Sequence, residues 1–409
     1  MVNFMIQKVI LEEIIISQRA NLSKSEIGIL RDKEKDIKII DSFAVIITGI
    51  RRCGKSTIMH HLLRKQKLWY YLNLEDPRLE GFDLQDFNRV ESIMKELYGN
   101  GGVYFFDEIQ NIEKWEKFIR YILDKKEKVV ITCSNASLLS EELGTKLTGR
   151  HIQLELFPFS YKEFLKLKKE DKSIKSFEEY LFKGGFPEYL KKDYPPILNE
   201  LLSDVVTKDV GIRFGIRNIA MLNKLAIYLI SNIGKEFSYN SIKNMLKIKS
   251  VQTIIDYVNH LENSYLLFTV PRFSYSYRQQ LINPKKVYSI DNGFSVNNSV
   301  TFSKDKGKML ENCIFLELRR NFKDIFYFQE VYECDFLIKE KEKIVKAIQV
   351  CYEINEENKD REINGLMTAL KKFNLNDGII LSFNQDDEFL IEGKKIKIKP
   401  AMEWLLDFK

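Results

Sequence analysis

The chain has 409 residues, 44% of them apolar and 30% charged, so we expect a soluble protein of two or three domains. Its net charge of +6 permits nucleic-acid binding but is below that of a dedicated binder. No apolar run reaches the roughly 18 residues of a membrane span, and five cysteines without a CxxC pair suit a reducing cytoplasm. Charged residues interrupt the N-terminal 20 residues, which favours an amphipathic helix over a signal peptide.

The segment 45–57, "VIITGIRRCGKST", carries the strongest motif of the chain. It matches G-x-x-x-x-G-K-[ST] between a β-rich run and a helical pattern. The N–H groups of such a loop and the following helix N-terminus bind phosphate. Lys55 is expected to contact the β- and γ-phosphates, and Ser56 to contact Mg²⁺. The predicted nucleotide-binding residues are Gly49, Ile50, Arg51, Arg52, Cys53, Gly54, Lys55, Ser56 and Thr57.

The segment 101–110, "GGVYFFDEIQ", supplies the acidic partner of this loop. A buried-strand run delivers two consecutive acids, Asp107 and Glu108. Asp107 is expected to hold Mg²⁺, directly or through water, and Glu108 to orient and deprotonate the attacking water. The alternative is an ordinary solvated strand end, but the phosphate loop upstream favours the catalytic interpretation.

Two further polar positions follow in the same region. β-rich runs at 68–74, 128–139 and 151–159 alternate with helical stretches, which predicts a parallel, doubly wound sheet. Asn135 or Ser134, where the second run ends, could sense the γ-phosphate; the alternative is a plain polar strand end. Arg150 could neutralise the transferred phosphate in its own subunit or a neighbour's; the alternative is a surface arginine.

Five stretches together carry a family resemblance: "TGIRRCGKST", "FFDEIQ", "CSNASLLS", "LTGR" and "LFPFSYKEFL". They resemble the AAA-like P-loop ATPases of bacteria and archaea, the AAA_14 family, that carry a DUF4143 region at the C-terminus. The resemblance implies ATP as the nucleotide, with Mg²⁺, and an ASCE-type sheet with an extra strand between the two Walker motifs. We expect this ATPase domain to cover residues 1–160. The resemblance supplies no substrate.

The middle of the chain, 161–300, is predicted to be a helical linker followed by a winged-helix-like domain. Three helical patterns and a β-ribbon occupy 221–272, and the third helix would be the one to read a DNA major groove. The aromatic residues of "FSYSYRQQ" alternate as on a strand; they could stack on bases or belong to a core. Protein docking is the alternative to DNA binding. The candidate contacts are Lys249, Ser250, Gln252, Thr253, Arg272 and Arg278.

The last part, 301–409, is predicted to contain a helix at 306–322, a strand at 325–330, a hairpin within 333–352, a helix and a strand. This order resembles the PD-(D/E)XK restriction-endonuclease core. The resemblance places Glu311 and Asp335 at its acidic positions, and Gln349 and Cys351 where an acid and a lysine belong. Because glutamine is a poor Mg²⁺ ligand and cysteine is no fixed cation, we expect a nuclease-like fold without useful cleavage.

The predicted fold class is therefore α/β, with a P-loop NTPase, a helical middle and a restriction-endonuclease-like end. The leading hypothesis is a Mg²⁺-dependent ATPase whose hydrolysis of ATP changes the conformation of attached DNA- or protein-binding domains. The alternatives are an ATP-regulated DNA-binding protein and an active ATP-dependent nuclease. The expected partners are ATP, DNA, and a protein partner or a second copy of the chain, with no membrane.

Overall fold

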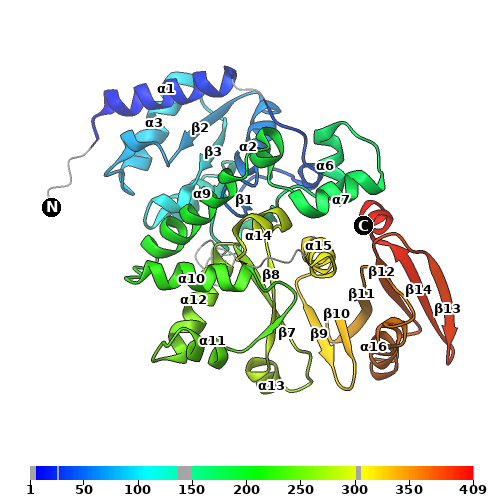
Figure 1. Ribbon diagram of the computed structural model, residues 1–409. Helices are drawn as coiled ribbons and strands as arrows, with labels where there is room; N and C mark the ends of the chain where they lie inside the picture. The colour runs from blue at the N-terminus through cyan, green and yellow to red at the C-terminus, as the bar shows by residue number, and fades with distance from the viewer. Residues whose placement is uncertain (1–5, 25–26, 137–146, 148, 301–304, 409) are drawn as a thin grey trace. The chain divides into compact units, whose positions relative to one another are not determined.

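A computed structural model of the chain describes residues 6–24, 27–136, 147, 149–300 and 305–408 (Figure 1). The chain divides into two compact units, Met1–Leu156 and Phe157–Lys409, called unit 1 and unit 2 below. The expected further division near residue 300 stays a prediction. Across the described ranges, no helix is both long enough and apolar enough to cross a membrane.

Unit 1 is built on a five-stranded sheet in which all neighbouring strands are parallel. In spatial order the strands are β2 (Trp69–Asn73), β3 (Val103–Asp107), β4 (Val129–Cys133), β1 (Ala44–Thr48) and β5 (His151–Glu155). Every residue of β1, β3 and β4 is buried, as expected for strands covered on both faces. The predicted parallel sheet is thus confirmed, and β4 is the strand between the two motif-bearing strands.

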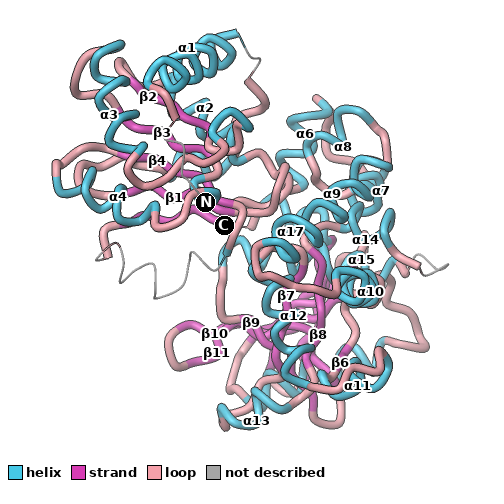
Figure 2. The backbone as a smooth tube through the Cα atoms, turned by 90° about the vertical axis from the view of Figure 1, so that its left-hand side faces the viewer, coloured by secondary structure: helices cyan, strands magenta, loops and turns pink. Residues whose placement is uncertain are grey.

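Helices cover both faces of this sheet; Figure 2 shows β1 to β4 side by side among them. One core cluster joins apolar side chains of α1, α3 and α4 to alternate strand residues such as Ile46, Tyr104 and Phe106. The helix α2 packs against β3 and β4 outside that cluster, on the opposite face. Within its described residues, the helices of unit 1 are α1 (Lys8–Lys24), η1 (Asp32–Asp36), α2 (Lys55–Arg64), η2 (Pro77–Leu79), α3 (Asp86–Tyr98), η3 (Ile109–Asn111) and α4 (Trp115–Asp124).

Unit 2 begins with a group of helices separated by short breaks. Capping boxes at Ser160 and Ser173 begin two of them, because each serine accepts the N–H three residues later. A Cβ at Gly185 would lie 2.2 Å from the carbonyl oxygen of Phe159, so a close backbone approach requires glycine at this break. The helices are α6 (Tyr161–Lys168), α7 (Ile174–Lys183), α8 (Pro187–Lys192), α9 (Pro196–Asp204) and the π-helix η5 (Val205–Ile212).

Three helices and a β-ribbon follow, as predicted from the sequence, except that a two-residue strand of the ribbon lies between the first and second helices. Ser238 caps the second helix by accepting the N–H of Ser241. The strands pair antiparallel in the order β6-β8-β7. The elements are α10 (Ile219–Ile230), β6 (Glu236–Phe237), α11 (Tyr239–Met245), α12 (Val251–Asn263), β7 (Leu267–Pro271), β8 (Lys285–Ser289) and α14 (Asn292–Asn298).

The strand-like alternation predicted for "FSYSYRQQ" is wrong. The segment contains the short helix α13 (Tyr277–Ile282), which begins because Ser276 accepts the N–H of Gln279. Tyr275 and Tyr277 are 78% and 72% exposed, so they do not belong to a core.

The C-terminal part of unit 2 contains a six-stranded sheet in the order β13-β14-β12-β11-β10-β9. The predicted hairpin is confirmed, with Phe336 opposite Ile348 in antiparallel register. Helix α16 packs its apolar side chains onto β10, β11 and β12. The elements are α15 (Lys306–Asn321), β9 (Ile325–Gln329), β10 (Glu333–Glu340), β11 (Lys343–Val350), α16 (Lys359–Lys372), β12 (Asp377–Ser382), β13 (Asp387–Ile391), β14 (Lys394–Pro400) and α17 (Ala401–Asp407).

Candidate nucleotide site

The loop between β1 and α2 has a conformation that requires glycine at both ends. Gly49 has φ +153°, and a Cβ there would lie 2.1 Å from the carbonyl oxygen of Leu156. Gly54, at the start of α2, is left-handed with φ +102°. Both conformations are unfavourable for residues with a side chain. The backbone of the loop can therefore curl toward a phosphate at the helix N-terminus.

Lys55, the first residue of α2, is buried and turned back into this loop. Its Nζ donates to the carbonyl oxygens of Gly49 at 3.2 Å and Ile50 at 3.3 Å. It also lies 3.3 Å from Glu108 Oε1. Burial alone would lower the pKa of Lys55, but the negative charges around it, that of Glu108 first and that of Asp107 among them, together outweigh burial and raise it. The ammonium group is therefore charged in the place where a nucleotide phosphate would need it.

Asp107, at the carboxyl end of β3, is held by hydroxyl groups. Its Oδ2 accepts a hydrogen bond from the Tyr71 hydroxyl at 3.2 Å, and its Oδ1 accepts one from Thr132. Burial and the charge of Glu108 raise its pKa, whereas the hydroxyls of Thr132 and Ser56 and the charge of Lys55 oppose this. The structure thus brings Ser56 and Asp107 together. A hydroxyl beside a carboxylate is the pair of oxygen donors that Mg²⁺ takes in P-loop enzymes.

Glu108 has an unusual backbone conformation, with φ +52°. For a residue other than glycine this conformation is uncommon and is found at functional sites. Its N–H donates to Thr132 Oγ1 at 2.9 Å. Burial would raise the pKa of Glu108, but Lys55, Gln110 and Arg51 outweigh burial and lower it. Glu108 is therefore an ionised carboxylate in a fixed place.

Gln110, to which no motif in the sequence pointed, positions Glu108. Its Nε2 donates to Glu108 Oε2 at 2.5 Å and to Ser134 Oγ at 3.1 Å. Of the two alternatives at the end of β4, Ser134 is thus the side chain linked to the acids. Asn135 is buried beside it, and its N–H points to Cys133 Sγ. The turn η3 brings Gln110 back to Glu108, and the sequence carries no signal for that turn.

The remaining loop residues are anchored by charged partners. Arg51 Nη1 lies 2.6 Å from Glu75 Oε1, just beyond β2. The carbonyl oxygen of the buried Cys53 accepts a hydrogen bond from Arg31 Nη1 at 2.8 Å. Arg31 is itself buried and was also missed, because it precedes the motif by more than ten residues. Arg52 is exposed, with a left-handed φ of +62°.

Arg150 does not join this site within its own chain. It directly precedes β5, and its carbonyl oxygen accepts the N–H of Ala44 at the start of β1. Because β1 and β5 are parallel, Arg150 lies at the amino edge of the sheet, whereas the phosphate loop lies at the carboxyl edge. Its Nη2 contacts Asp124 Oδ1 at 2.7 Å. A role in a neighbouring subunit stays a prediction.

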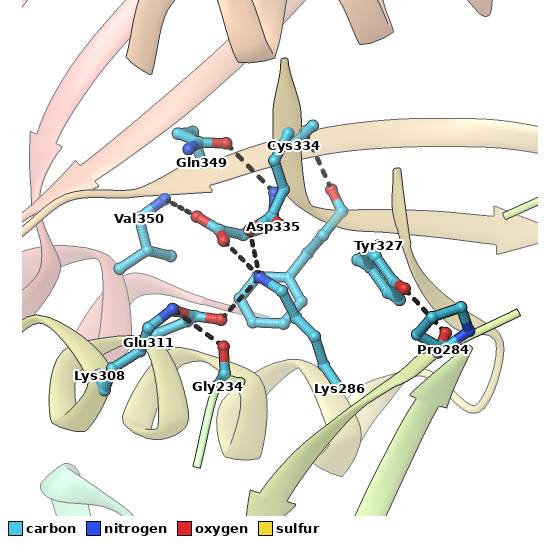
Figure 3. Close-up of polar contacts among 12 residues, drawn as sticks. Gly234, Pro284, Lys286, Lys308, Glu311, Tyr327, Cys334, Asp335, Gln349 and Val350 are labelled. Atoms are coloured by element: carbon cyan, nitrogen blue, oxygen red, sulfur yellow. Dashed lines mark hydrogen bonds and ion pairs between the residues drawn. The ribbon is translucent and has the colours of Figure 1, made fainter. Parts of the chain in front are cut away.

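Of the four residues named for the second predicted site, Glu311, Asp335 and Gln349 lie together in unit 2 (Figure 3). Gln349 Oε1 accepts the N–H of Asp335 at 3.1 Å. Asp335 and Glu311 are joined through Lys286, which no pattern in the sequence pointed to. Cys351 is buried and donates to the carbonyl oxygen of Glu353 at 3.2 Å. The order of helices and strands in this part of the chain does not by itself show that it is a nuclease.

Comparisons with known proteins agree with the geometry of unit 1. Residues 41–165 match the AAA domain family AAA_14. Residues 174–303 match a domain of unknown function, DUF8612, where the resemblance had implied a DUF4143 region. The DUF4143 assignment therefore finds no support in the family that matches this part of the chain.

Relatives extend over the whole chain. The "Uncharacterized protein MJ1544" of Methanocaldococcus jannaschii is 35% identical, over 100% of this chain and 98% of the relative. An uncharacterized protein of Haemophilus influenzae is 28% identical, over 89% and 94% respectively. Among solved structures, a DNA polymerase III gamma subunit-related protein of Thermotoga maritima is 12% identical, covering 61% of this chain and 99% of that chain, with a TM-score of 0.26. The chain carries an AAA domain and belongs to the same family as MJ1544 of Methanocaldococcus jannaschii.

Proposed function

We propose that this protein binds ATP with Mg²⁺ and hydrolyses it to ADP and phosphate. One observation carries the proposal: the lysine of the phosphate loop and the two consecutive acids at the carboxyl end of β3 converge at one edge of the sheet. Lys55 lies 3.3 Å from Glu108, and Ser56 and Thr132 lie against Asp107. This set of groups is the one that phosphoryl transfer to water requires.

Each residue has a separate role in the proposal. Lys55 leaves the carbonyl oxygens of its own loop and contacts the β- and γ-phosphates of ATP. Ser56 and Asp107 hold Mg²⁺, which when bound neutralises charge on the phosphate oxygens. Glu108, kept ionised by Lys55 and Gln110, accepts a proton from the attacking water. Ser134 accepts a hydrogen bond from Gln110 and, in this proposal, senses the γ-phosphate.

The phosphate loop is also tied to the end of unit 1, which supports coupling to the attached domains. The N–H of Leu156 donates to the carbonyl oxygen of Thr48 at 2.7 Å, directly before the loop. Cys53 Sγ, within the loop, donates to the carbonyl oxygen of Leu156 at 3.5 Å. Leu156 is the last residue of unit 1. A change of the loop on ATP binding therefore acts on the residue that leads into unit 2.

Phosphate release by the pure protein tests the proposal, with Lys55→Ala and Glu108→Gln as variants. We expect Mg²⁺-dependent release that both variants remove. Phosphate release that Lys55→Ala leaves unchanged, or a protein that binds no ATP at any concentration, would contradict the proposal. Hydrogen exchange of unit 2 with and without a non-hydrolysable ATP analogue tests the coupling separately. Identical exchange in the presence of bound analogue contradicts the coupling but leaves the ATPase intact.

Nucleic-acid binding by unit 2 is the second candidate function. The two exposed tyrosines, Tyr275 and Tyr277, favour it, because exposed aromatic rings beside cations stack on bases. Arg278 is exposed on the short helix α13, which begins at Tyr277, and Lys249 and Gln252 are exposed on either side of the first residue of α12. Arg272 is no part of this surface, because its guanidinium donates to the carbonyl oxygen of Gln329.

Retention of labelled DNA at increasing salt tests this second function. We expect binding at low salt that falls steeply toward physiological salt, since phosphate contacts release counterions. The variant Tyr275→Ala/Tyr277→Ala should weaken retention, whereas Tyr194→Ala, also at an exposed tyrosine, should not. No retention even at low salt favours protein docking instead.

A further inference from the structure

Lys286 is a buried lysine whose amine lies among three carboxylates. It stands on β8, and its side chain is 1% exposed. Its Nζ lies 2.9 Å from Asp335 Oδ1 on β10 and 3.1 Å from Glu311 Oε1 on α15, as Figure 3 shows. Glu333 Oε1, at the start of β10, is 2.6 Å away. Three acids from two elements therefore share one cation.

The carboxylates of Glu311 and Asp335 have further hydrogen-bond partners besides Lys286. Glu311 Oε1 accepts a second hydrogen bond from the Tyr288 hydroxyl at 2.7 Å. Its Oε2 lies 2.7 Å from Lys308 Nζ. Asp335 Oδ2 accepts the N–H of Val350 at 3.0 Å (Figure 3). Both carboxylates are thereby fixed in orientation, as a buried ion cluster requires.

Charge keeps the amine of Lys286 protonated. Burial alone would lower the pKa of Lys286, but the carboxylates of Asp335 and Glu311 outweigh burial and raise it well above its ordinary value. The cluster holds two positive groups, Lys286 and Lys308, and three negative ones, Glu311, Glu333 and Asp335. The nearly balanced charge makes the cluster tolerable in a buried place.

Two buried carboxylates aimed at one point are what a divalent cation with oxygen ligands takes. Here that point is filled by the ammonium group, at hydrogen-bond distances. Gln349 adds no third ligand. Its Oε1 accepts the N–H of Asp335, and its Nε2 donates to Glu362 Oε2 at 2.7 Å. Both polar ends of Gln349 are thus used away from the amine.

We propose that Lys286 is a protein-supplied cation that takes the place of a divalent metal between Glu311 and Asp335. In this place it ties β8, in the three-stranded sheet, to α15 and to β10 of the six-stranded sheet. The cluster is a structural ion site that excludes divalent metal and therefore metal-dependent cleavage. The inference is independent of ATP hydrolysis in unit 1.

Thermal melting of three variants tests the structural role. Lys286→Met leaves buried acids without their cation, and Glu311→Gln/Asp335→Asn leaves the cation without its two buried acids, with only the partly exposed Glu333 beside it. We expect each to lower the melting temperature by on the order of 10 °C. The triple variant, which leaves only the partly exposed Glu333 and Lys308 without these partners, should lose clearly less than the sum of the two. A loss equal to the sum, or a Lys286→Met variant as stable as the wild type, overturns the proposal.

Lys285→Met is the matched control. Lys285 is the preceding lysine on the same strand, it is only half-buried, and its Nζ contacts the Tyr239 hydroxyl at 3.1 Å. The same substitution there removes a similar side chain from the same strand but no cation from the cluster. We expect its melting temperature within about 2 °C of the wild type.

Binding of Mn²⁺ in the absence of nucleotide, followed by electron paramagnetic resonance, tests the metal position. Lys286→Met should take up one Mn²⁺ per chain, and Lys286→Met/Asp335→Asn none. The wild type should take up no Mn²⁺, like the Lys286→Met/Asp335→Asn variant. A folded Lys286→Met variant that takes up no Mn²⁺ overturns the metal position. A wild-type Mn²⁺ site, or plasmid nicking by the wild type, that disappears in Asp335→Asn overturns the exclusion of metal.

Discussion

Lys55 Nζ lies 3.3 Å from Glu108 Oε1, so the lysine proposed to bind phosphate and the proposed catalytic base are ion-paired in this structure. The pair has a consequence for binding, because the same amine must turn to phosphate when ATP arrives. Glu108→Gln removes the charge that competes with the phosphates. We expect this variant to bind ATP as tightly as the wild type or tighter, while hydrolysis falls by about 10³-fold.

Equilibrium binding of a fluorescent ATP analogue, together with single-turnover hydrolysis, measures both effects. Lys67→Met is a suitable control, because Lys67 is an exposed lysine just beyond α2, at the opposite end of this helix from the loop. Loss of ATP affinity in Glu108→Gln would contradict the proposed competition, since the glutamate would then be needed for binding itself.

The motif residues could be predicted because their chemistry is local. Gly49, Gly54 and Lys55 act within one loop of a few residues, and Asp107 and Glu108 end one apolar strand. The parallel sheet then brings the two stretches to one edge by its topology, which the alternation of strands and helices already indicates. The parallel sheet of unit 1 and the meeting of its motif residues at one edge therefore followed from contiguous patterns.

Arg31 and Lys286, to which no motif pointed, act across long sequence separations. Arg31 reaches Cys53, and Lys286 reaches Asp335, 49 residues later. Nothing in a stretch such as "KKVYS" distinguishes a lysine that points to solvent from one that points inward, because the face depends on strand register. Arg150 illustrates the same limit: the edge of the sheet at which it lies follows from the pairing of β5 with β1.

Gln110 is predicted to act as a positioning residue for Glu108. Its amide bridges Glu108 Oε2 and Ser134 Oγ, and this hydrogen bond lowers the pKa of Glu108. Gln110→Ala should therefore lower kcat by about 10-fold with little change in KM. The acid limb of the pH profile of kcat should also move to higher pH, because the base then loses a group that favours its ionised form.

The pH profile separates this role from a merely structural one. Gln110→Glu is informative beside it, since a second carboxylate next to Glu108 should move the acid limb further in the same direction. A lower kcat with an unmoved acid limb in both variants would show that Gln110 only supports the turn η3.

Arg150 is predicted to act only from a neighbouring subunit. Its guanidinium pairs with Asp124 at the amino edge of the sheet, so Arg150→Ala should leave ATP affinity unchanged. Hydrolysis should fall by about 10³-fold if a second copy supplies the arginine. Mixing Arg150→Ala with Glu108→Gln then restores part of the activity, because each inactive copy supplies what the other lacks. An Arg150→Ala variant with wild-type turnover contradicts the role.

His60 is predicted to make unit 1 sensitive to acid. It lies on α2, half-buried, with its ring 6.1 Å from that of Tyr71 and its buried Nε2 without a hydrogen bond among the described residues. Burial and the nearby charges of Arg64 and His61 lower its pKa to about 4. An unfolded histidine titrates near pH ~6.5, so between that pH and about 4 the unfolded chain binds more protons than the folded one. The contribution of neutral His60 to stability is therefore complete above pH ~6.5 and is lost as the pH falls through this window.

His60→Gln cannot titrate, so its free energy of unfolding, measured by urea denaturation, should fall less than that of the wild type between pH 7 and 4, by on the order of 2 kcal/mol. Parallel curves for the two proteins over this range would show that the ring finds a proton acceptor when it is charged.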